Sequence, residues 1–134
     1  MLTSVFVYGT LKRGECRESL WPCIPVSIQV GWTRGMLFHR HDYPAMQAGE
    51  DRVRGEFWSF TDEQMPQVMR VLDQIEGTNQ PGFDDLYRRV RVEVYATDDQ
   101  PLGTAFGYHY AADPLADGFT RVVPAEPDAW IQWP

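Results

Sequence analysis

Residues 87–110 carry the pattern that most constrains the fold of this chain. Along residues 87–95, three valines alternate with charged side chains, which is the period of a β-strand with one buried face. A turn-forming stretch, residues 97–101, separates this segment from a second strand pattern over residues 102–110. We therefore expect an antiparallel hairpin, with β-structure as a major component of the fold.

Four other segments have the composition of strands. Residues 5–8 form a short apolar run that stops at Gly9, and its unbroken apolarity predicts a strand buried on both faces. Residues 27–32 alternate between larger apolar and polar or small residues. Residues 35–38 and 53–60 are expected as two further strands.

One segment predicts a regular helix. Thr61 and Gln64 fit the Thr-x-x-Gln form of a capping box, and apolar residues at helical spacing follow over 65–75. Pro66 would interrupt a helix that began at Thr61, so we expect it to open the regular helix after a preliminary turn. Gly77 is well placed to end the helix. About six strands and one good helix predict an α+β fold with a curved or closed sheet.

Composition and length limit the class of protein. A chain of 134 residues without repeats or linkers predicts a single domain over 1–134, with a tail over 112–134 that wraps the surface through Trp130 and Trp133. The net charge of −7 disfavours nucleic-acid binding. No apolar run reaches the ~18 residues of a membrane span, and the start does not resemble a signal peptide. We expect a soluble cytoplasmic protein without membrane or nucleic-acid partners.

Metal and thiol sites have little support in the sequence. Cys16 and Cys23 are too few for a disulfide scaffold or a four-ligand zinc site. His39 and His41, followed by Asp42, could share a strand face, but no third ligand is close. We expect no metal and no cofactor. A nucleophilic cysteine paired with a histidine stays open as an alternative.

Residues 8–14, Tyr-Gly-Thr-Leu-Lys-Arg-Gly, form the first candidate site. They follow a buried strand, and Gly9 allows the backbone to bend and to approach a ligand closely. Successive N–H groups at such a bend can form a nest for a carboxylate or an oxyanion. The alternative is a plain turn with Lys12 and Arg13 in solvent. The spacing of a phosphate-binding loop is absent.

Glu76 is the second candidate. It lies four residues after Leu72, which places its carboxylate beside the apolar stripe at the C-terminal end of the helix. Partial burial and the negative end of the helix dipole would both raise its pKa toward the range of a useful general base. The alternative is a solvent-facing glutamate at a frayed helix end. Asp73 is either its partner or a surface residue.

The start of the predicted hairpin is the third candidate. Strand alternation places Tyr87 and Arg89 on one face and Arg88 on the face of the valines. An arginine at this point lies either at the rim of the sheet or paired in a pocket. Of the aromatic residues on the second strand, Tyr110 at its end is the one expected to reach a pocket.

Five short blocks together resemble the γ-glutamylcyclotransferase-like proteins, and the most similar subgroup is that of γ-glutamylamine cyclotransferases and plant avirulence-induced-like proteins. Each block is weak alone, but five in family order are specific, and they cover roughly residues 2–110. The blocks are residues 5–14, residues 35–38 with 43–45, residues 53–57, residues 72–77 and residues 87–90.

The resemblance implies a small mixed β-barrel of about six strands with a few flanking helices. It also implies a metal-independent enzyme, a monomer or weak homodimer, that converts a small γ-glutamyl amine or amide to 5-oxoproline and a free amine. The alternative is a non-catalytic module of the same fold that holds a small carboxylate. By this resemblance the catalytic glutamate is Glu76, the backbone that cradles the substrate is that of Tyr8, Gly9, Thr10 and Leu11, and the tyrosine beside an arginine is Tyr87, with Arg89 or Arg88.

Overall fold

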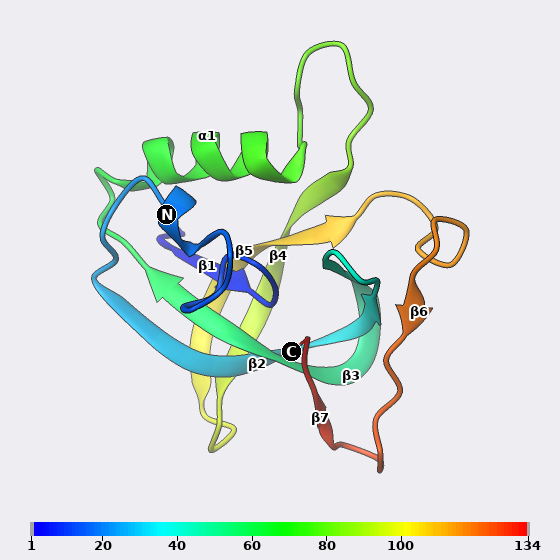
Figure 1. The fold of residues 1–134 in the computed structure, drawn as a ribbon. Helices are drawn as coiled ribbons and strands as arrows, with labels where there is room; N and C mark the ends of the chain where they lie inside the picture. Colours follow the sequence, from blue (N-terminus) through cyan, green and yellow to red (C-terminus); the bar gives the residue numbers. More distant parts are fainter. Residues whose placement is uncertain (1, 134) are drawn as a thin grey trace.

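A closed mixed barrel of five strands forms the centre of the molecule (Figure 1). The computed structural model describes residues 2–133. The barrel follows the order β2-β4-β5-β1-β3, and a β2–β3 pairing closes it; β1 and β5 are parallel, and the other pairs are antiparallel. The barrel strands are β1 (Ser4–Val7), β2 (Ser27–His39), β3 (Pro44–Ser59), β4 (Tyr87–Ala96) and β5 (Pro101–Tyr110).

A few short elements complete the described chain. They are the 3-10 helix η1 (Glu18–Leu20), the helix α1 (Met65–Glu76) and the strands β6 (Thr120–Arg121) and β7 (Trp130–Ile131). The α+β class and the mixed barrel are therefore confirmed. None of the helices in the described chain has the length and apolarity needed to cross a membrane.

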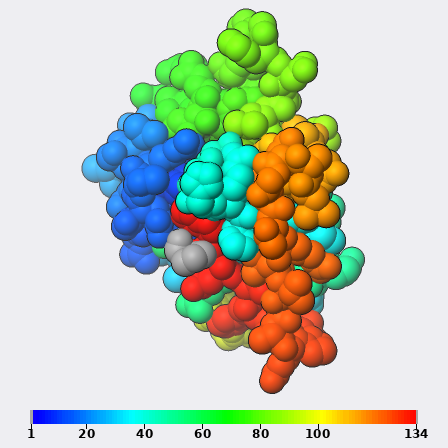
Figure 2. Space-filling view, turned by 45° about the vertical axis from the view of Figure 1, so that its right-hand side comes forward, coloured from blue at the N-terminus to red at the C-terminus, as the bar shows by residue number. Residues whose placement is uncertain are grey.

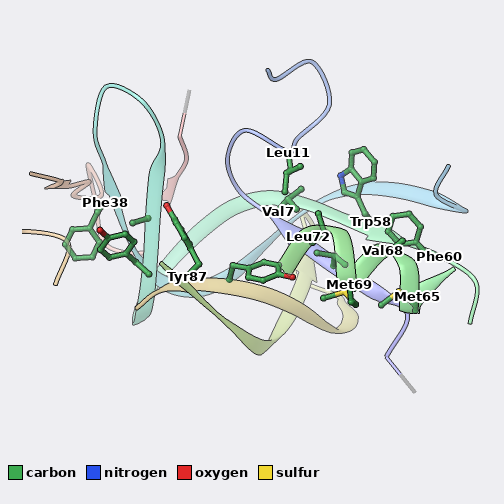
Figure 3. Packing of buried hydrophobic residues seen from close by; sticks show 14 of the residues in the cluster. Val7, Leu11, Phe38, Trp58, Phe60, Met65, Val68, Met69, Leu72 and Tyr87 are labelled. Atoms are coloured by element: carbon green, nitrogen blue, oxygen red, sulfur yellow. The ribbon is translucent and has the colours of Figure 1, made fainter. Parts of the chain in front are cut away.

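Strand β1 is buried on both faces, as its unbroken apolar sequence predicted. Val5 and Val7 pack in the cluster that holds the buried face of α1, and Figure 3 shows Val7 beside this helix. Phe6 points the opposite way and packs against Val92 and Val94 in a second cluster. Because a strand in a closed barrel has one outer and one inner face, β1 joins the core beneath α1 to the barrel interior.

The local signals for α1 are also confirmed. The Thr61 N–H donates to Oε1 of Gln64 at 2.9 Å, and the Gln64 N–H donates to the Thr61 hydroxyl at 3.3 Å. The helix begins at Met65 with Pro66 in its first turn, where the missing N–H costs nothing. Gly77 ends it in the left-handed conformation, with φ of 66°.

Two expected strand boundaries are wrong. Segments 27–32 and 35–38 belong to the single strand β2, and the segment predicted as 53–60 begins earlier, as part of β3. Between Gly35 and Met36 the pairing with β3 shifts, and residues 48–50 have no partner in the register. The apparent break at Gly35 is therefore a bulge in a continuous hairpin.

The hairpin predicted from residues 87–110 is formed by β4 and β5 in antiparallel register. Val92 and Val94 are buried in the barrel cluster, whereas Tyr87 is buried in the cluster beneath α1. Alternate side chains of β4 therefore pack in two different clusters, one inside the barrel and one beneath α1.

The tail pairs with two barrel strands through β6 and β7. Ile131 is 5% exposed and packs in the barrel cluster. Trp130 remains partly exposed, with the guanidinium carbons of Arg52 and Arg54 at 5.5 and 5.1 Å from its ring centroid. Figure 2 shows the tail, coloured orange to red, returning to the blue N-terminal segment, where Nζ of Lys12 donates to the Trp133 carbonyl at 3.0 Å.

Candidate active site

A cavity of about 150 Å³ lies beside the C-terminal end of α1. Its walls come from the end of β1 with the turn after it, the start of β3, the end of α1 and the tyrosines of the β4–β5 hairpin. The residues that line it are Phe6, Val7, Tyr8, Gly9, Thr10, Leu11, Arg17, Tyr43, Pro44, Ile75, Glu76, Leu86, Tyr87 and Tyr108.

The turn after β1 is held tightly against the start of β3. A Cβ atom at Gly9 would lie 2.6 Å from Cγ of Pro44, so this approach requires glycine. The Lys12 N–H donates to the Gly9 carbonyl at 3.1 Å, and the Arg17 N–H donates to the Thr10 carbonyl at 2.9 Å. In the structure Gly9 makes its close approach to Pro44; the approach to a ligand stays a prediction.

The backbone N–H groups of residues 9–11 have no hydrogen-bond partner among residues 2–133. All three residues are buried, and buried donors are almost always satisfied by protein, water or ligand. Donors that lack a protein partner and line a cavity can receive a carboxylate or an oxyanion. Tyr8 lies at the start of this turn, so the cradle predicted at residues 8–11 is brought together in one wall.

Trp21 fixes this turn from outside. Its ring is stacked on that of Trp58 with centroids 4.3 Å apart, and its Nε1 donates to the Leu11 carbonyl at 2.8 Å. The loop that leaves the cavity is therefore tied to β3.

Glu76 is the last residue of α1 and lines the same cavity as this turn. Burial raises the pKa of its carboxyl to about 7, and the positive charge of Arg17 opposes that rise. The apolar stripe predicted to place it there is formed by Met65, Val68 and Leu72, which are buried beneath the helix. A carboxyl with this pKa exchanges protons readily at neutral pH.

Three tyrosines build the remaining polar wall. The Tyr87 hydroxyl donates to the Pro44 carbonyl at 2.7 Å, and the Tyr8 hydroxyl donates to the Tyr108 carbonyl at 2.7 Å. Burial raises the pKa of all three phenols well above the usual value, so they stay neutral. Tyr108 lines the cavity instead of the expected Tyr110, whose hydroxyl donates to Oδ2 of Asp117 at 2.6 Å.

Arg89 lies on the α1 side of β4 and pairs with the helix. Its Nη1 is 3.4 Å from Oδ2 of Asp73, and Oδ1 of the same carboxylate accepts from the Tyr108 hydroxyl at 2.7 Å. Arg88 is exposed. In the described part of the chain neither arginine lines the cavity, so Arg89 reaches it only through Asp73 and Tyr108.

Arg17 is the lining residue that sequence analysis missed. It lies three residues beyond the block that ends at Gly14, in an irregular loop where no periodic pattern assigns a direction to a side chain. The only available signal is an arginine close to a predicted anion cradle in an acidic chain.

The other sequence candidates lie outside the cavity lining. Cys16 is exposed, and Sγ of the partly buried Cys23 is 3.6 Å from the side-chain oxygen of Gln67. His39 and His41 are both exposed. Within residues 2–133, no three histidine, cysteine, aspartate or glutamate side chains are grouped as ligands for a metal ion.

Comparison with known proteins gives the same family that the five sequence blocks resemble. Residues 5–130 match the family model described as gamma-glutamyl cyclotransferase, AIG2-like. A search of curated proteins found no match.

Solved structures show the same fold. An AIG2-like protein from Mus musculus has a TM-score of 0.63 and 22% identity, with 99% of this chain and 96% of that chain covered. An uncharacterized protein from Pyrococcus horikoshii has a TM-score of 0.59 and 21% identity, with coverages of 90% and 85%. YkqA from Bacillus subtilis has a TM-score of 0.60 and 25% identity; the match covers 91% of this chain and 38% of the longer protein.

Proposed function

Because the chain belongs to the gamma-glutamyl cyclotransferase, AIG2-like family, we propose that it cyclises the γ-glutamyl group of a small amine or amide conjugate. The products are 5-oxoproline and a free amine. One observation carries this proposal above the others: Glu76, whose carboxyl has a pKa of about 7, lines the same small cavity as the unpartnered N–H groups of residues 9–11.

The substrate supplies the nucleophile, its own α-amine, so no serine or cysteine is needed. Ionised Glu76 takes a proton from the α-ammonium, and the freed lone pair attacks the γ-carbonyl carbon. Glu76 then donates this proton to the leaving nitrogen, and the amide C–N bond breaks as the lactam C–N bond is completed. The second proton of the ring nitrogen passes through Glu76 to the released amine, and Glu76 ends ionised.

The pKa of Glu76 suits both halves of this cycle. With a pKa of about 7, it is ionised in part of the molecules near neutral pH and still acidic enough to return the proton. Burial supplies this value, since an ordinary exposed glutamate would be fully ionised at neutral pH and a weaker base.

The N–H groups of residues 9–11 supply electrostatic stabilisation. They are fixed before the reaction by Pro44 and by Trp21, so they need no reorganisation when negative charge develops on the γ-carbonyl oxygen. The small volume of the cavity, about 150 Å³, favours a folded substrate, which brings the amine near the carbonyl and contributes to the rate through proximity.

Release of 5-oxoproline from a panel of γ-glutamyl amines and γ-glutamyl amino acids tests the proposal. Glu76→Gln should lower kcat at least about a hundredfold, the usual range for loss of a general base. Glu63→Gln, an exposed glutamate just before α1, is the matched control and should keep native activity. The native kcat/KM should rise with pH through an acid limb near the Glu76 pKa of about 7.

Two results would contradict the mechanism. Equal activity of the native protein and Glu76→Gln would exclude Glu76 as the base. Loss of activity in the double variant Cys16→Ser with Cys23→Ser would instead favour a thiol nucleophile. A native protein that binds 5-oxoproline but turns over none of the panel would be a carboxylate-binding module of the same fold.

A further inference from the structure

Arg17 is the only lysine or arginine among the described residues that line the cavity. The chain as a whole carries a net charge of −7, which works against the approach of an anionic ligand. A γ-glutamyl compound is such a ligand, because its α-carbon bears a carboxylate. A local cation is therefore the feature that the cavity needs beyond its N–H groups.

The guanidinium of Arg17 has no protein partner in residues 2–133. Six other arginines of this range form ion pairs and are thereby occupied: Arg13, Arg34, Arg40, Arg52, Arg89 and Arg121. Arg17 is half-buried and donates only its backbone N–H, to the Thr10 carbonyl at 2.9 Å. A half-buried guanidinium without a carboxylate partner is prepared to receive one from a ligand.

The backbone of Arg17 is fixed by the same turn that presents the N–H groups of residues 9–11. The Thr10 carbonyl accepts from Arg17, and the next residue, Leu11, accepts from Nε1 of Trp21 at 2.8 Å. Arg17 and the N–H groups therefore belong to one preorganised wall of the cavity that Glu76 also lines.

The chemistry of the γ-glutamyl group indicates what Arg17 contacts. Its ammonium and its carboxylate are attached to the same carbon, so a ligand with its ammonium at Glu76 has its carboxylate within a few ångströms of that position. Arg17 and Glu76 both line this cavity, and the positive charge of Arg17 lowers the pKa of the Glu76 carboxyl.

We propose that Arg17 binds the α-carboxylate of the γ-glutamyl group and makes this carboxylate a requirement for binding. This inference takes the class of ligand from the proposed function. It also assigns the N–H groups of residues 9–11 to the γ-carbonyl oxygen, since the α-carboxylate then has a partner of its own. A bidentate guanidinium–carboxylate contact would fix the orientation of the α-carbon, and with it the position of the amine.

Ligand binding tests the inference without turnover. Calorimetry should compare 5-oxoproline with 2-pyrrolidinone, the same lactam without the carboxylate. For 5-oxoproline, Arg17→Gln should weaken binding roughly tenfold or more, as expected when a charge-assisted hydrogen bond is lost. Arg17→Lys should recover part of the affinity. Arg70→Gln, an exposed arginine on α1, is the control and should bind as the native protein does.

The lactam without a carboxylate separates recognition from a general change in the cavity. Native protein and Arg17→Gln should bind 2-pyrrolidinone with equal affinity. Unchanged 5-oxoproline affinity in Arg17→Gln would overturn the proposal, as would a native protein that does not bind 5-oxoproline. An equal loss of affinity for both lactams would also overturn it, because the effect would then be structural.

Turnover distinguishes the two carboxylates that a substrate can carry. The substrates are γ-glutamyl-butylamine and γ-glutamyl-aminobutyrate, which differ by a carboxylate on the leaving group. Arg17→Gln should raise KM for both by the same factor, with a smaller change in kcat. A rise confined to the second substrate would place Arg17 at the leaving group and overturn the proposal. Arg17-dependent binding without any turnover would support the Arg17 site while rejecting the cyclotransferase.

Discussion

Glu76 combines a cost for folding with the proposed role of general base. Its carboxyl lies in a cavity where burial disfavours the anion, and the one charge that favours the anion is that of Arg17. A pKa of about 7 in the folded chain, against an ordinary value near 4.5, means that the folded protein holds this proton over a pH range where the unfolded chain has lost it.

The free energy of unfolding should therefore depend on pH through Glu76. Because the folded pKa is raised, the folded state binds more protons than the unfolded state between the two values. The Glu76 contribution is thus fully present below about pH 4.5 and is lost as the pH rises through about 7. The loss amounts to about 3 kcal/mol at most. Glu76→Gln should remove this slope.

Urea unfolding at pH 4.5 and pH 8 measures this effect. Relative to the native protein, Glu76→Gln should be more stable at pH 8 than at pH 4.5, whereas Glu63→Gln should follow the native protein at both. Parallel pH profiles for the native protein and Glu76→Gln would mean that Glu76 has no raised pKa in the fold. Its role as a base poised near neutral pH would then lose its physical ground.

At the scale of elements, the sequence correctly predicted the features whose signals lie close together along the chain. The capping box, the apolar stripe and Gly77 lie within one helical segment, so the bounds of α1 and the place of Glu76 at its end follow from neighbouring residues. The hairpin of β4 and β5 is equally local, because one short turn joins its strands.

The misplaced strand boundaries depend on residues far apart in sequence. Gly35 looks like a break in β2, but Met36 continues the strand because β3 accommodates a bulge opposite it. A Cβ atom at Gly49, on that bulge, would lie 2.9 Å from Cβ of Met36. Only the pairing itself reveals that these glycines permit a close crossing.

The residues of the candidate site also fall into two groups, those that local sequence predicts and those that it does not. Glu76 and the turn at Gly9 were found because each follows directly from a regular element. Arg17 and Tyr108 enter the cavity only after an irregular loop and the closure of the barrel have fixed them. The resemblance pointed to an arginine beside Tyr87, yet the fold directs Arg89 to Asp73 on α1.

Trp21 links the loop containing η1 to both stability and binding. Its ring stacks on Trp58, 4.3 Å away, and lies 5.4 Å from Phe60, while its Nε1 supports the Leu11 carbonyl. We expect Trp21→Ala to lower the free energy of unfolding by about 2–3 kcal/mol, through lost packing and stacking. We also expect a lower kcat, since the N–H groups of residues 9–11, which stabilise the charge that develops on the γ-carbonyl oxygen, lose their support.

Two variants separate these effects. Trp21→Phe keeps an aromatic ring on Trp58 but removes the hydrogen bond to Leu11, so it should affect kcat more than stability. Leu20→Ala, at an exposed neighbour in η1, should change neither. Urea unfolding and 5-oxoproline release measure the two quantities. A native kcat in both Trp21 variants would show that the turn holds its shape without this anchor.

On the scale of the whole molecule, the C-terminal tail returns to the loop that follows β1. Lys12 follows the turn that lines the cavity, and its Nζ donates to the Trp133 carbonyl at 3.0 Å. β7 lies parallel to β3, with Ile131 paired to Val53. The tail therefore contacts the barrel interior and the loop after β1 at once, although its sequence shows no strand period.

Ile131 should make the tail part of the cooperative fold. It is 5% exposed and packs in the barrel cluster, so Ile131→Ala should lower the free energy of unfolding by about 2–4 kcal/mol, the range for truncation of a buried aliphatic side chain. Val123→Ala is the matched control, because Val123 lies in the same tail and is 70% exposed. Urea unfolding should show one transition, shifted only in the Ile131 variant. Native stability in Ile131→Ala would mean that the barrel core is complete without the side chain of Ile131.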